Sequence, residues 1–418
     1  MNIERKHIIN GGFLVGAVAG ANFLNFLFNA ILGRWLSFED FGLVTLIITF
    51  YSVTSLFTNS LAGVINFSVS KFSGADTENQ QLPFLKTTLR KSTVFLCVAV
   101  VVWCISMPLL MSVFHVPTYV PLLAFIPVFI ASMYAYPIIG YFQGKLEFLF
   151  AGILIVCEAL IKLVVGLLFP ILHLNSYSYL SIPVSLIVVS LVAWILLKNK
   201  IRGLAAVTHV QYSFPTKYYL TSIAVGVGST LFFSVDILLV RHFFSSELSG
   251  QYALVSLIGK MVFFLSVLPN MFTLPVVART SDKKRIKKLF MVLIAATFSL
   301  SLVAWIALGG FGSVLVPMLF GEKSLVILPL LPMYTLGVGL YVLSSVIVTF
   351  HLAQQNYAFS YPLITAGIVV GILILLRHHS LTEITTNITA TCALLLSFLV
   401  VMHFYNLRKE MIHAQVIS

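Results

Sequence analysis

The sequence predicts an all-α polytopic membrane protein with about twelve transmembrane helices in two pseudo-symmetric lobes. Three observations support this prediction. Hydrophobic residues make up 59% of the 418 residues and charged residues only 9%, whereas soluble domains carry about 25% charged residues, so the bilayer has to be the solvent. The apolar runs suit spanning helices and lack the alternation of barrel strands. A pattern of landmark residues also returns half a chain later.

This repeat links Ile31–Gly42 to Leu238–Tyr252. In both stretches an apolar segment ends on an arginine, Arg34 or Arg241, and a short aromatic and serine linker leads to a glutamate and then a glycine. Laid over each other without a gap, the copies pair Glu39 with Glu247, Gly42 with Gly250 and Lys71 with Arg279. Few residues are identical, so the spacing of the landmarks carries the prediction of two related halves.

The net charge of +12 is explained by topology. With the N-terminus inside, most lysines and arginines fall in the inner segments, and the positive-inside rule then places both termini in the cytoplasm. The protein is therefore expected in the cytoplasmic membrane, and nucleic-acid binding is not expected. The basic residues assigned to outer segments are Arg34, Arg241, Lys323 and Arg377.

Two lobes and a linker are predicted: an N-terminal lobe over 1–200, a cytoplasmic linker over 201–216 and a C-terminal lobe over 217–418. The segment from Lys198 to Lys217 is the longest polar interruption and lies at the midpoint. The N-terminus enters an apolar segment without a small-residue cleavage site, which predicts a first helix and not a removed signal.

The first predicted span, roughly Ile8–Gly33, carries Asn22, Asn25 and Asn29 on one helix face because they are spaced three and four apart. The second span, roughly Phe41–Ser70, carries Asn59 and Asn66 among several hydroxyl side chains. Polar side chains are unfavourable in lipid, so both faces are predicted to point to protein or to a cavity. The last part of the polar stretch that follows, residues 71–92, is predicted to form a short amphipathic surface helix.

The later spans contain four charged side chains, which are functional candidates because burying an unpaired charge is costly. The fifth span carries Glu158 and Lys162, four residues apart, and two interpretations stay open: a structural ion pair, or a lysine that binds an anion with Glu158 tuning it. The seventh carries Asp236, which is either an Na⁺ or H⁺ coupling acid or a structural acid that pairs with Arg241 or Lys260 or is hydrogen-bonded. Lys260, in the eighth span, has no acid near it on its own helix, which favours a cavity-facing role.

Arg34 and Arg241 stand at the outer ends of the first and seventh helices. They are either interfacial anchors or, if the halves face each other across a cleft, a pair of guanidinium groups that bind phosphate through parallel hydrogen bonds. No catalytic residue is predicted, since outer loops are short and no phosphate-binding glycine loop or nucleophile elbow is present. The cysteines and histidines lack metal-ligand spacing, so neither a metal site nor a cofactor is expected.

Three stretches resemble the polysaccharide-export and O-antigen flippases of the multidrug/oligosaccharidyl-lipid/polysaccharide (MOP) superfamily, which also contains the MATE exporters. They are GGFLVGAVAGANFLNFLFNAILGRWLSFEDFGLVTL, SVSKF and FFSVDILLVRHFFSSELSGQYALVSLIGK. The resemblance implies two six-helix lobes around a central cavity and alternating access. It also implies a cationic cavity for a lipid pyrophosphate, a role that falls to Arg34, Arg241 and Lys260, with Lys162, and a coupling acid at Asp236.

Three functions follow as hypotheses. The first is a flippase that carries a polyprenyl-pyrophosphate-linked oligosaccharide to the outer leaflet, supported by the cations in the spans. Membrane lipids and polysaccharide-assembly enzymes would be its other partners. The second is a cation-coupled multidrug exporter of the MATE type, disfavoured because cations outnumber acids. The third is a membrane-embedded glycan polymerase or glycosyltransferase, disfavoured by the short outer loops.

Overall fold

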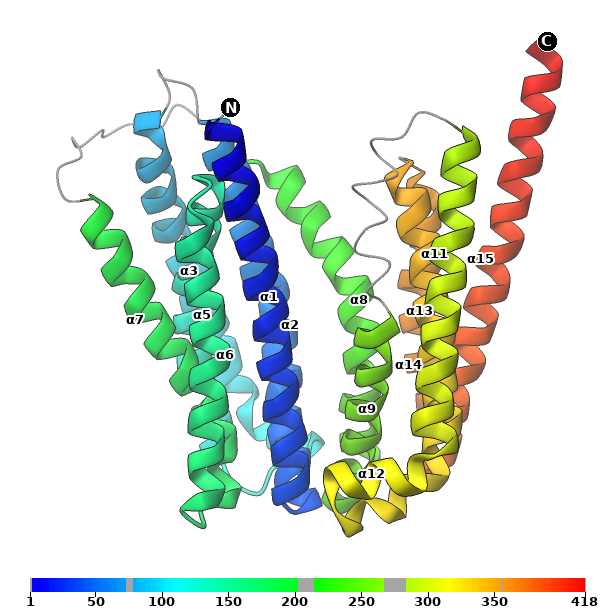
Figure 1. Cartoon of the computed structure of the whole chain (residues 1–418). Helices are drawn as coiled ribbons and strands as arrows, with labels where there is room; N and C mark the ends of the chain where they lie inside the picture. Colours follow the sequence, from blue (N-terminus) through cyan, green and yellow to red (C-terminus); the bar gives the residue numbers. More distant parts are fainter. Residues whose placement is uncertain (1, 73–77, 202–213, 267–282, 355, 418) are drawn as a thin grey trace. The chain divides into compact units, whose positions relative to one another are not determined.

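The computed structural model describes the chain except for residue 1 and residues 73–77, 202–213, 267–282, 355 and 418 (Figure 1). All regular structure of the described residues is helical, which confirms the all-α prediction. Ten helical segments among them are long and apolar enough to cross a membrane. The chain divides into two compact units, Met1–Val227 and Gly228–Ser418.

The division between the units falls inside the helix α8 (Thr216–Phe243). Most of the predicted linker, 201–216, lies outside the described residues. The predicted lobe boundaries, 1–200 and 217–418, therefore stay predictions.

Unit 1 is built around α5 and α6. The helix α5 packs on α2, α3 and α7, and α6 packs on α1 and α7. The elements of this unit are α1 (Asn2–Trp35), α2 (Phe38–Lys71), η1 (Glu78–Gln80), α3 (Gln81–Val113), α4 (Val120–Leu123), α5 (Ile126–Gly144), α6 (Phe148–Ile171), η2 (Asn175–Leu180) and α7 (Ser181–Ile201).

A close crossing of α2 and α5 fixes the geometry of unit 1. A Cβ atom at Gly140 would clash with the backbone carbonyl of Ala62, and one at Gly144 would lie 2.8 Å from the carbonyl oxygen of Asn66. The two glycines are four residues apart, the small-residue spacing that lets membrane helices approach closely. This crossing holds the polar face of α2 against α5.

The polar stretch after α2 does not contain a separate surface helix, contrary to the prediction. The helix α3 begins at Gln81 and continues unbroken to Val113. The buried Gln81 side chain donates hydrogen bonds to the carbonyl oxygens of Val69 and Phe72, both at 3.2 Å. These bonds satisfy acceptors left free at the end of α2, so the amphipathic turns form the start of a spanning helix.

Unit 2 is built around α13, which packs on α9, α11 and α15, while α14 packs on α15. A π-helical segment, η4 (Ile306–Gly310), separates α11 from α12. Besides the second part of α8, the described elements of this unit are α9 (Ser246–Ser266), α11 (Lys283–Trp305), α12 (Gly312–Phe320), η5 (Glu322–Leu330), α13 (Leu331–Ala353), η6 (Tyr357–Ser360), α14 (Tyr361–Leu376) and α15 (Leu381–Ile417).

The landmarks of the sequence repeat mark two equivalent helix starts. Ser37 accepts a hydrogen bond from the backbone N–H of Asp40 at 3.1 Å, and Ser245 accepts one from Leu248 at 3.3 Å. Each serine precedes a helix whose first turn is acidic, with Glu39 in α2 and Glu247 in α9. A serine cap and early acids stabilise a helix N-terminus, which explains why these residues recur.

Candidate functional site

The first polar cluster lies inside unit 1, where Glu158 of α6 meets tyrosines from α2 and α5. Tyr51 donates a hydrogen bond to Oε1 of Glu158 at 2.9 Å. Tyr136 donates to Oε2 at 3.0 Å and lies 3.2 Å from Oε1, and the two tyrosine hydroxyls also contact each other. We call these three residues, with Lys162, the unit-1 cluster. Its carboxylate is held by partners from two other helices.

Lys162 lies one turn after Glu158 on α6 and is attracted electrostatically to that carboxylate. Its Nζ also lies 5.6 Å from the ring centre of Phe28, a buried residue of α1. That distance allows a cation–π attraction. The Lys162 side chain is half-buried, so the charge is stabilised by protein and can still be reached by a ligand.

The second polar cluster lies inside unit 2 around Asp236 of α8, which is only 2% exposed. Tyr252 of α9 donates to Oδ2 of Asp236 at 2.7 Å, and Tyr334 of α13 donates to the same oxygen at 3.3 Å. The backbone N–H of Ile237 donates to Oδ1 at 2.8 Å. Such donors favour a buried carboxylate because they replace the water it has lost.

Lys260 completes this unit-2 cluster, which we define as Asp236, Tyr252, Tyr334 and Lys260. Lys260 follows Tyr252 by eight residues on α9, so the two share a helix face. It is attracted electrostatically to Asp236 and is half-buried. The acid of its own helix, Glu247 in the first turn of α9, is far from it in sequence, as expected, and the carboxylate of the cluster comes from α8.

The two predicted arginines differ in burial. Arg34, in the last turn of α1, is exposed. Arg241, at the end of α8, is 2% exposed, and its Nη1 donates a long hydrogen bond of 3.5 Å to the carbonyl oxygen of Ser246 at the start of α9. Their predicted convergence on one substrate phosphate stays a prediction, and Arg241 also has a local contact that joins two helices.

The predicted asparagines do not form one network. Asn29 donates to the backbone oxygen of Asn25 at 2.8 Å, and Oδ1 of Asn25 is buried without a hydrogen-bond partner among the described residues. Asn66 donates to Gln143 of α5 at 3.4 Å. Asn22 and Asn59 are exposed. Their predicted cavity role is untested by these contacts.

The tyrosines are the residues that sequence reasoning did not assign to the site. Tyr51, Tyr136, Tyr252 and Tyr334 supply the side-chain hydroxyl donors to both carboxylates. A signal was present, because a tyrosine inside an apolar span needs a partner for its hydroxyl. The sequence could have suggested that four such tyrosines donate to the two acids within spans. It could not have shown which tyrosine binds which acid.

Histidines form a contact that spacing did not indicate. Nε2 of His351 lies 2.8 Å from Nδ1 of His403, which joins α13 to α15. The His351 ring also stacks on Phe359 with ring centres 3.5 Å apart. Among the residues that the structure describes, no group of three or more histidine, cysteine or acidic side chains could hold a metal ion.

Solved structures with the same fold are membrane transporters. The lipid II flippase MurJ, in an inward closed conformation, matches with a TM-score of 0.74 and 12% identity over 93% of this chain and 87% of that chain. An inward-facing multidrug resistance MATE family transporter of the MOP superfamily matches with a TM-score of 0.67 and 12% identity over 92% of this chain and 96% of the other.

A MOP superfamily transporter from Pyrococcus furiosus Vc1, whose reverse polarity of the binding pocket suggests a different function, matches with a TM-score of 0.54. It is 13% identical, over 96% of this chain and 95% of that chain. At these identities the likeness shows the fold, which is the predicted MOP and MATE-like one. A search of curated protein sequences finds no match.

The family is shown by a model that matches residues 31–329 and is described as Polysaccharide biosynthesis protein. Those residues cover both helix starts of the repeat and seven of the eight residues of the two clusters, and only Tyr334 lies outside the match. Family and fold agree with the expected class of a multi-pass membrane protein that belongs to polysaccharide biosynthesis. The chain belongs to the polysaccharide biosynthesis protein family and has the fold of the MOP superfamily.

Proposed function

We propose that this protein is a flippase that moves a polyprenyl-pyrophosphate-linked oligosaccharide from the inner to the outer leaflet of the cytoplasmic membrane by alternating access. The family supplies the link to polysaccharide biosynthesis. The relative MurJ is a lipid II flippase, so a lipid-linked substrate is compatible with this fold. Membrane lipids and polysaccharide-assembly enzymes are the expected partners, and both termini lie in the cytoplasm.

The observation that carries the proposal is a half-buried lysine in each unit. Lys162 and Lys260 both lie beside a carboxylate whose oxygens already accept hydrogen bonds from tyrosines. A pyrophosphate that leaves water needs cationic partners along its path, because an unpaired charge in a low-dielectric environment is costly. Each lysine is a site where the head group can exchange water for protein contacts, and Arg34 and Arg241 add charge at the outer ends.

The two acids are the proposed coupling residues. Asp236 and Glu158 can each take up a cation, Na⁺ or H⁺, and each is attracted to the lysine of its own cluster. Neutralising the carboxylate removes that attraction and leaves the lysine more available to an anion. Cation binding and head-group binding are thereby linked, since one ligand changes the affinity for the other by the same factor in both directions.

Transport is tested in liposomes that contain a fluorescent polyprenyl-pyrophosphate oligosaccharide, by its exposure to a membrane-impermeant glycosidase. Lys162→Gln and Lys260→Gln are each expected to slow translocation by about tenfold or more, the effect of losing roughly 1.4 kcal/mol of head-group stabilisation. The matched controls are the exposed lysines Lys86 and Lys288, and Lys86→Gln and Lys288→Gln should keep the wild-type rate. A wild-type rate in the double variant of Lys162 and Lys260, at equal incorporation, would overturn the proposal.

A cation-coupled multidrug exporter is the second candidate function, and one observation favours it. Each cluster combines a carboxylate with two aromatic rings, which is the chemistry that binds organic cations. Efflux of a cationic dye from loaded liposomes separates the two functions. Dye efflux that depends on Glu158 and Asp236, without glycan translocation, would support the exporter.

A further inference from the structure

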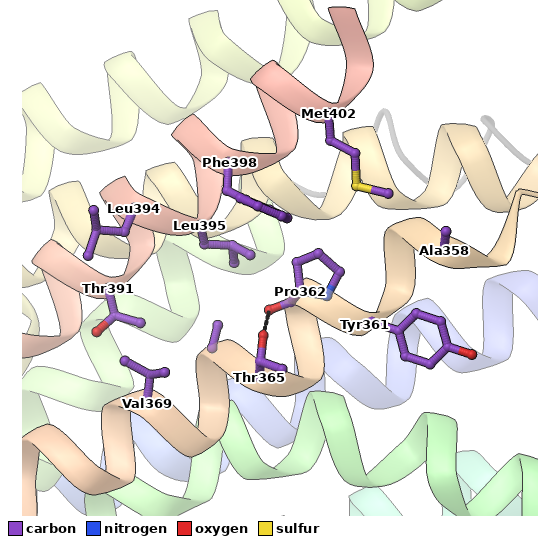
Figure 2. Close-up of a pocket in the computed structure, with 11 residues that line it drawn as sticks. Ala358, Tyr361, Pro362, Thr365, Val369, Thr391, Leu394, Leu395, Phe398 and Met402 are labelled. Atoms are coloured by element: carbon purple, nitrogen blue, oxygen red, sulfur yellow. Dashed lines mark hydrogen bonds between the residues drawn. The ribbon is translucent and has the colours of Figure 1, made fainter. Parts of the chain in front are cut away.

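An apolar groove runs along unit 2 between α14 and α15, and no residue of the unit-2 cluster lines it. It has a volume of about 590 Å³, and Figure 2 shows its walls, with Tyr361, Pro362 and Val369 on one helix and Leu394 and Phe398 on the other. Leu394 and Phe398 are 67% and 58% exposed. The groove therefore opens on the outside of two helices that are long and apolar enough to span the membrane.

The groove carries few polar groups. Three hydroxyl-bearing side chains line it, Tyr361, Thr365 and Thr391, and the two threonine hydroxyls are each satisfied within their own helix. Thr365 donates to the carbonyl oxygen of Pro362 at 2.9 Å, and Thr391 donates to that of Asn387 at 2.8 Å. The remaining walls are largely apolar. A ligand in this groove needs no hydrogen-bonding groups, which favours a hydrocarbon chain over a sugar or a polar head group.

The dimensions of the groove decide between a helix and a single chain. On α15 the lining residues extend from Thr391 to Met402, which corresponds to about 16 Å at a rise of 1.5 Å per residue. Dividing the volume by this length gives a cross-section of roughly 37 Å². A helix with its side chains is about 10 Å wide and covers roughly 80 Å², so the groove is narrower than a whole helix.

The length of the groove also matches one leaflet. The hydrocarbon core of a bilayer is about 30 Å thick, so half of it is about 15 Å. A chain that belongs to a single leaflet therefore fills the groove from end to end. A polyprenyl chain of a glycan carrier is longer than one leaflet and would extend well beyond it.

Basic residues lie beyond one end of the groove. The exposed Arg408 follows Met402 by six residues on α15, about 9 Å farther along the axis. Lys409 is the next residue in the sequence. Basic residues at a helix end attract anionic lipid head groups. An apolar groove that ends in positive charge is complementary to an anionic lipid along its length.

We propose that the groove between α14 and α15 binds one acyl chain of an anionic phospholipid whose phosphate lies at Arg408. The lipid occupies the leaflet in which α15 ends and is separate from the transported substrate.

The test compares two tryptophan substitutions on α14 in the full-length protein. Val369 lines the groove, whereas its neighbour Ile368 is 50% exposed and is not a lining residue. Each variant is purified from nanodiscs of phosphatidylglycerol and phosphatidylethanolamine into mild detergent. Native mass spectrometry then identifies the bound lipid by its mass and measures how much is retained. The wild type and Ile368→Trp are expected to retain one phosphatidylglycerol. In Val369→Trp the amount of bound phosphatidylglycerol is expected to fall about tenfold, because the indole fills the groove.

A charge variant separates chain binding from head-group binding. Arg408→Gln should keep a bound phospholipid and lose the preference for phosphatidylglycerol over phosphatidylethanolamine. Equal lipid retention in Val369→Trp and Ile368→Trp would overturn the proposal. A bound polyprenyl phosphate in place of the phospholipid, or a mass that corresponds to a second copy seated on α14, would overturn it as well. The test does not depend on transport.

Discussion

The unit-1 and unit-2 clusters have the same chemistry and are built from different helices. Each contains one acid, two tyrosines and one lysine. In unit 1 the acid and the lysine share α6, and the tyrosines come from α2 and α5. In unit 2 the acid stands on α8 and the lysine on α9, and the tyrosines come from α9 and α13. The lysine is therefore one turn from its acid in unit 1 and on a neighbouring helix in unit 2.

The gap-free repeat shows how one position is used in two ways. Superposing Glu39 on Glu247 places Tyr51 opposite Gly259. In unit 1 this position supplies a hydroxyl to the carboxylate. In unit 2 it has no side chain, and the ring of Tyr334 fills the space, since a Cβ at Gly259 would clash with it. Tyr334 then supplies the hydroxyl from α13. Both units contain a hydrogen-bonded acid, but the tyrosines that donate the hydrogen bonds stand at different positions in the two units.

The largest expected effect comes from removing the acid of unit 1. Glu158→Ala leaves Lys162 without its carboxylate and should lower the free energy of unfolding by about 3 kcal/mol, because an uncompensated buried charge is costly. Lys162→Met should cost much less, since Glu158 keeps both tyrosine donors. Chemical unfolding in detergent measures both. Equal losses for the two variants would show that the tyrosines do not hold the carboxylate, and the double variant should recover part of the loss of Glu158→Ala.

Alanine substitution should lower stability more at Gly140 than at Gly259, the two glycines where an added methyl group would clash with a neighbouring helix. At Gly140 a methyl group meets the backbone of α2, so Gly140→Ala has to push two helices apart, with an expected loss of about 2–3 kcal/mol. At Gly259 it meets the Tyr334 ring, which can shift by giving up its 3.3 Å bond to Asp236, with an expected loss of about 1 kcal/mol. Thermal unfolding gives the order, and Gly20→Ala, which meets open space, is the control. A larger loss at Gly259 would contradict the comparison.

The hydroxyl groups of the two unit-2 tyrosines should contribute unequally to stability. Tyr252 lies 2.7 Å from Asp236 and Tyr334 lies 3.3 Å from it. Tyr252→Phe should destabilise by about 1.5–2 kcal/mol, as expected for a hydrogen bond to a charged group, and Tyr334→Phe by less than about 1 kcal/mol. Both substitutions keep the ring, so the difference reports the hydroxyl group alone. Unfolding midpoints in detergent measure it, and a reversed order would contradict the geometry.

The smallest effect is expected at the paired arginines. Arg241 is buried and donates to Ser246, whereas Arg34 is exposed. Arg241→Gln should lower stability by about 1 kcal/mol, and Arg34→Gln should change it by less than about 0.5 kcal/mol. If both are substrate contacts, both variants should slow translocation in the liposome assay. Arg34→Gln with wild-type transport would leave that position as an interfacial anchor.

Much of the fold could be read from local patterns. Composition and run length predicted helices in a bilayer, and the landmark spacing pointed to two equivalent helix starts, which the serine caps at Ser37 and Ser245 explain. The surface helix predicted within 71–92 was wrong for a physical reason. Its amphipathic turns continue into α3, and the polar Gln81 is buried because it caps the end of α2.

The sequence by itself determined the helices and the bilayer as their solvent, and it predicted which charges lie within spans, because hydropathy and helical spacing are local properties. It named Glu158, Lys162, Asp236 and Lys260 as candidates on that basis. Only the tertiary structure decided their partners. Tyr51 is 107 residues from Glu158 and Tyr334 is 98 residues from Asp236, and no local periodicity relates residues so far apart. The close crossing of α2 with α5 and the missing side chain at Gly259 bring those hydroxyls to the acids. Hydrogen bonding of buried carboxylates depends on helix packing, which the order of residues does not reveal.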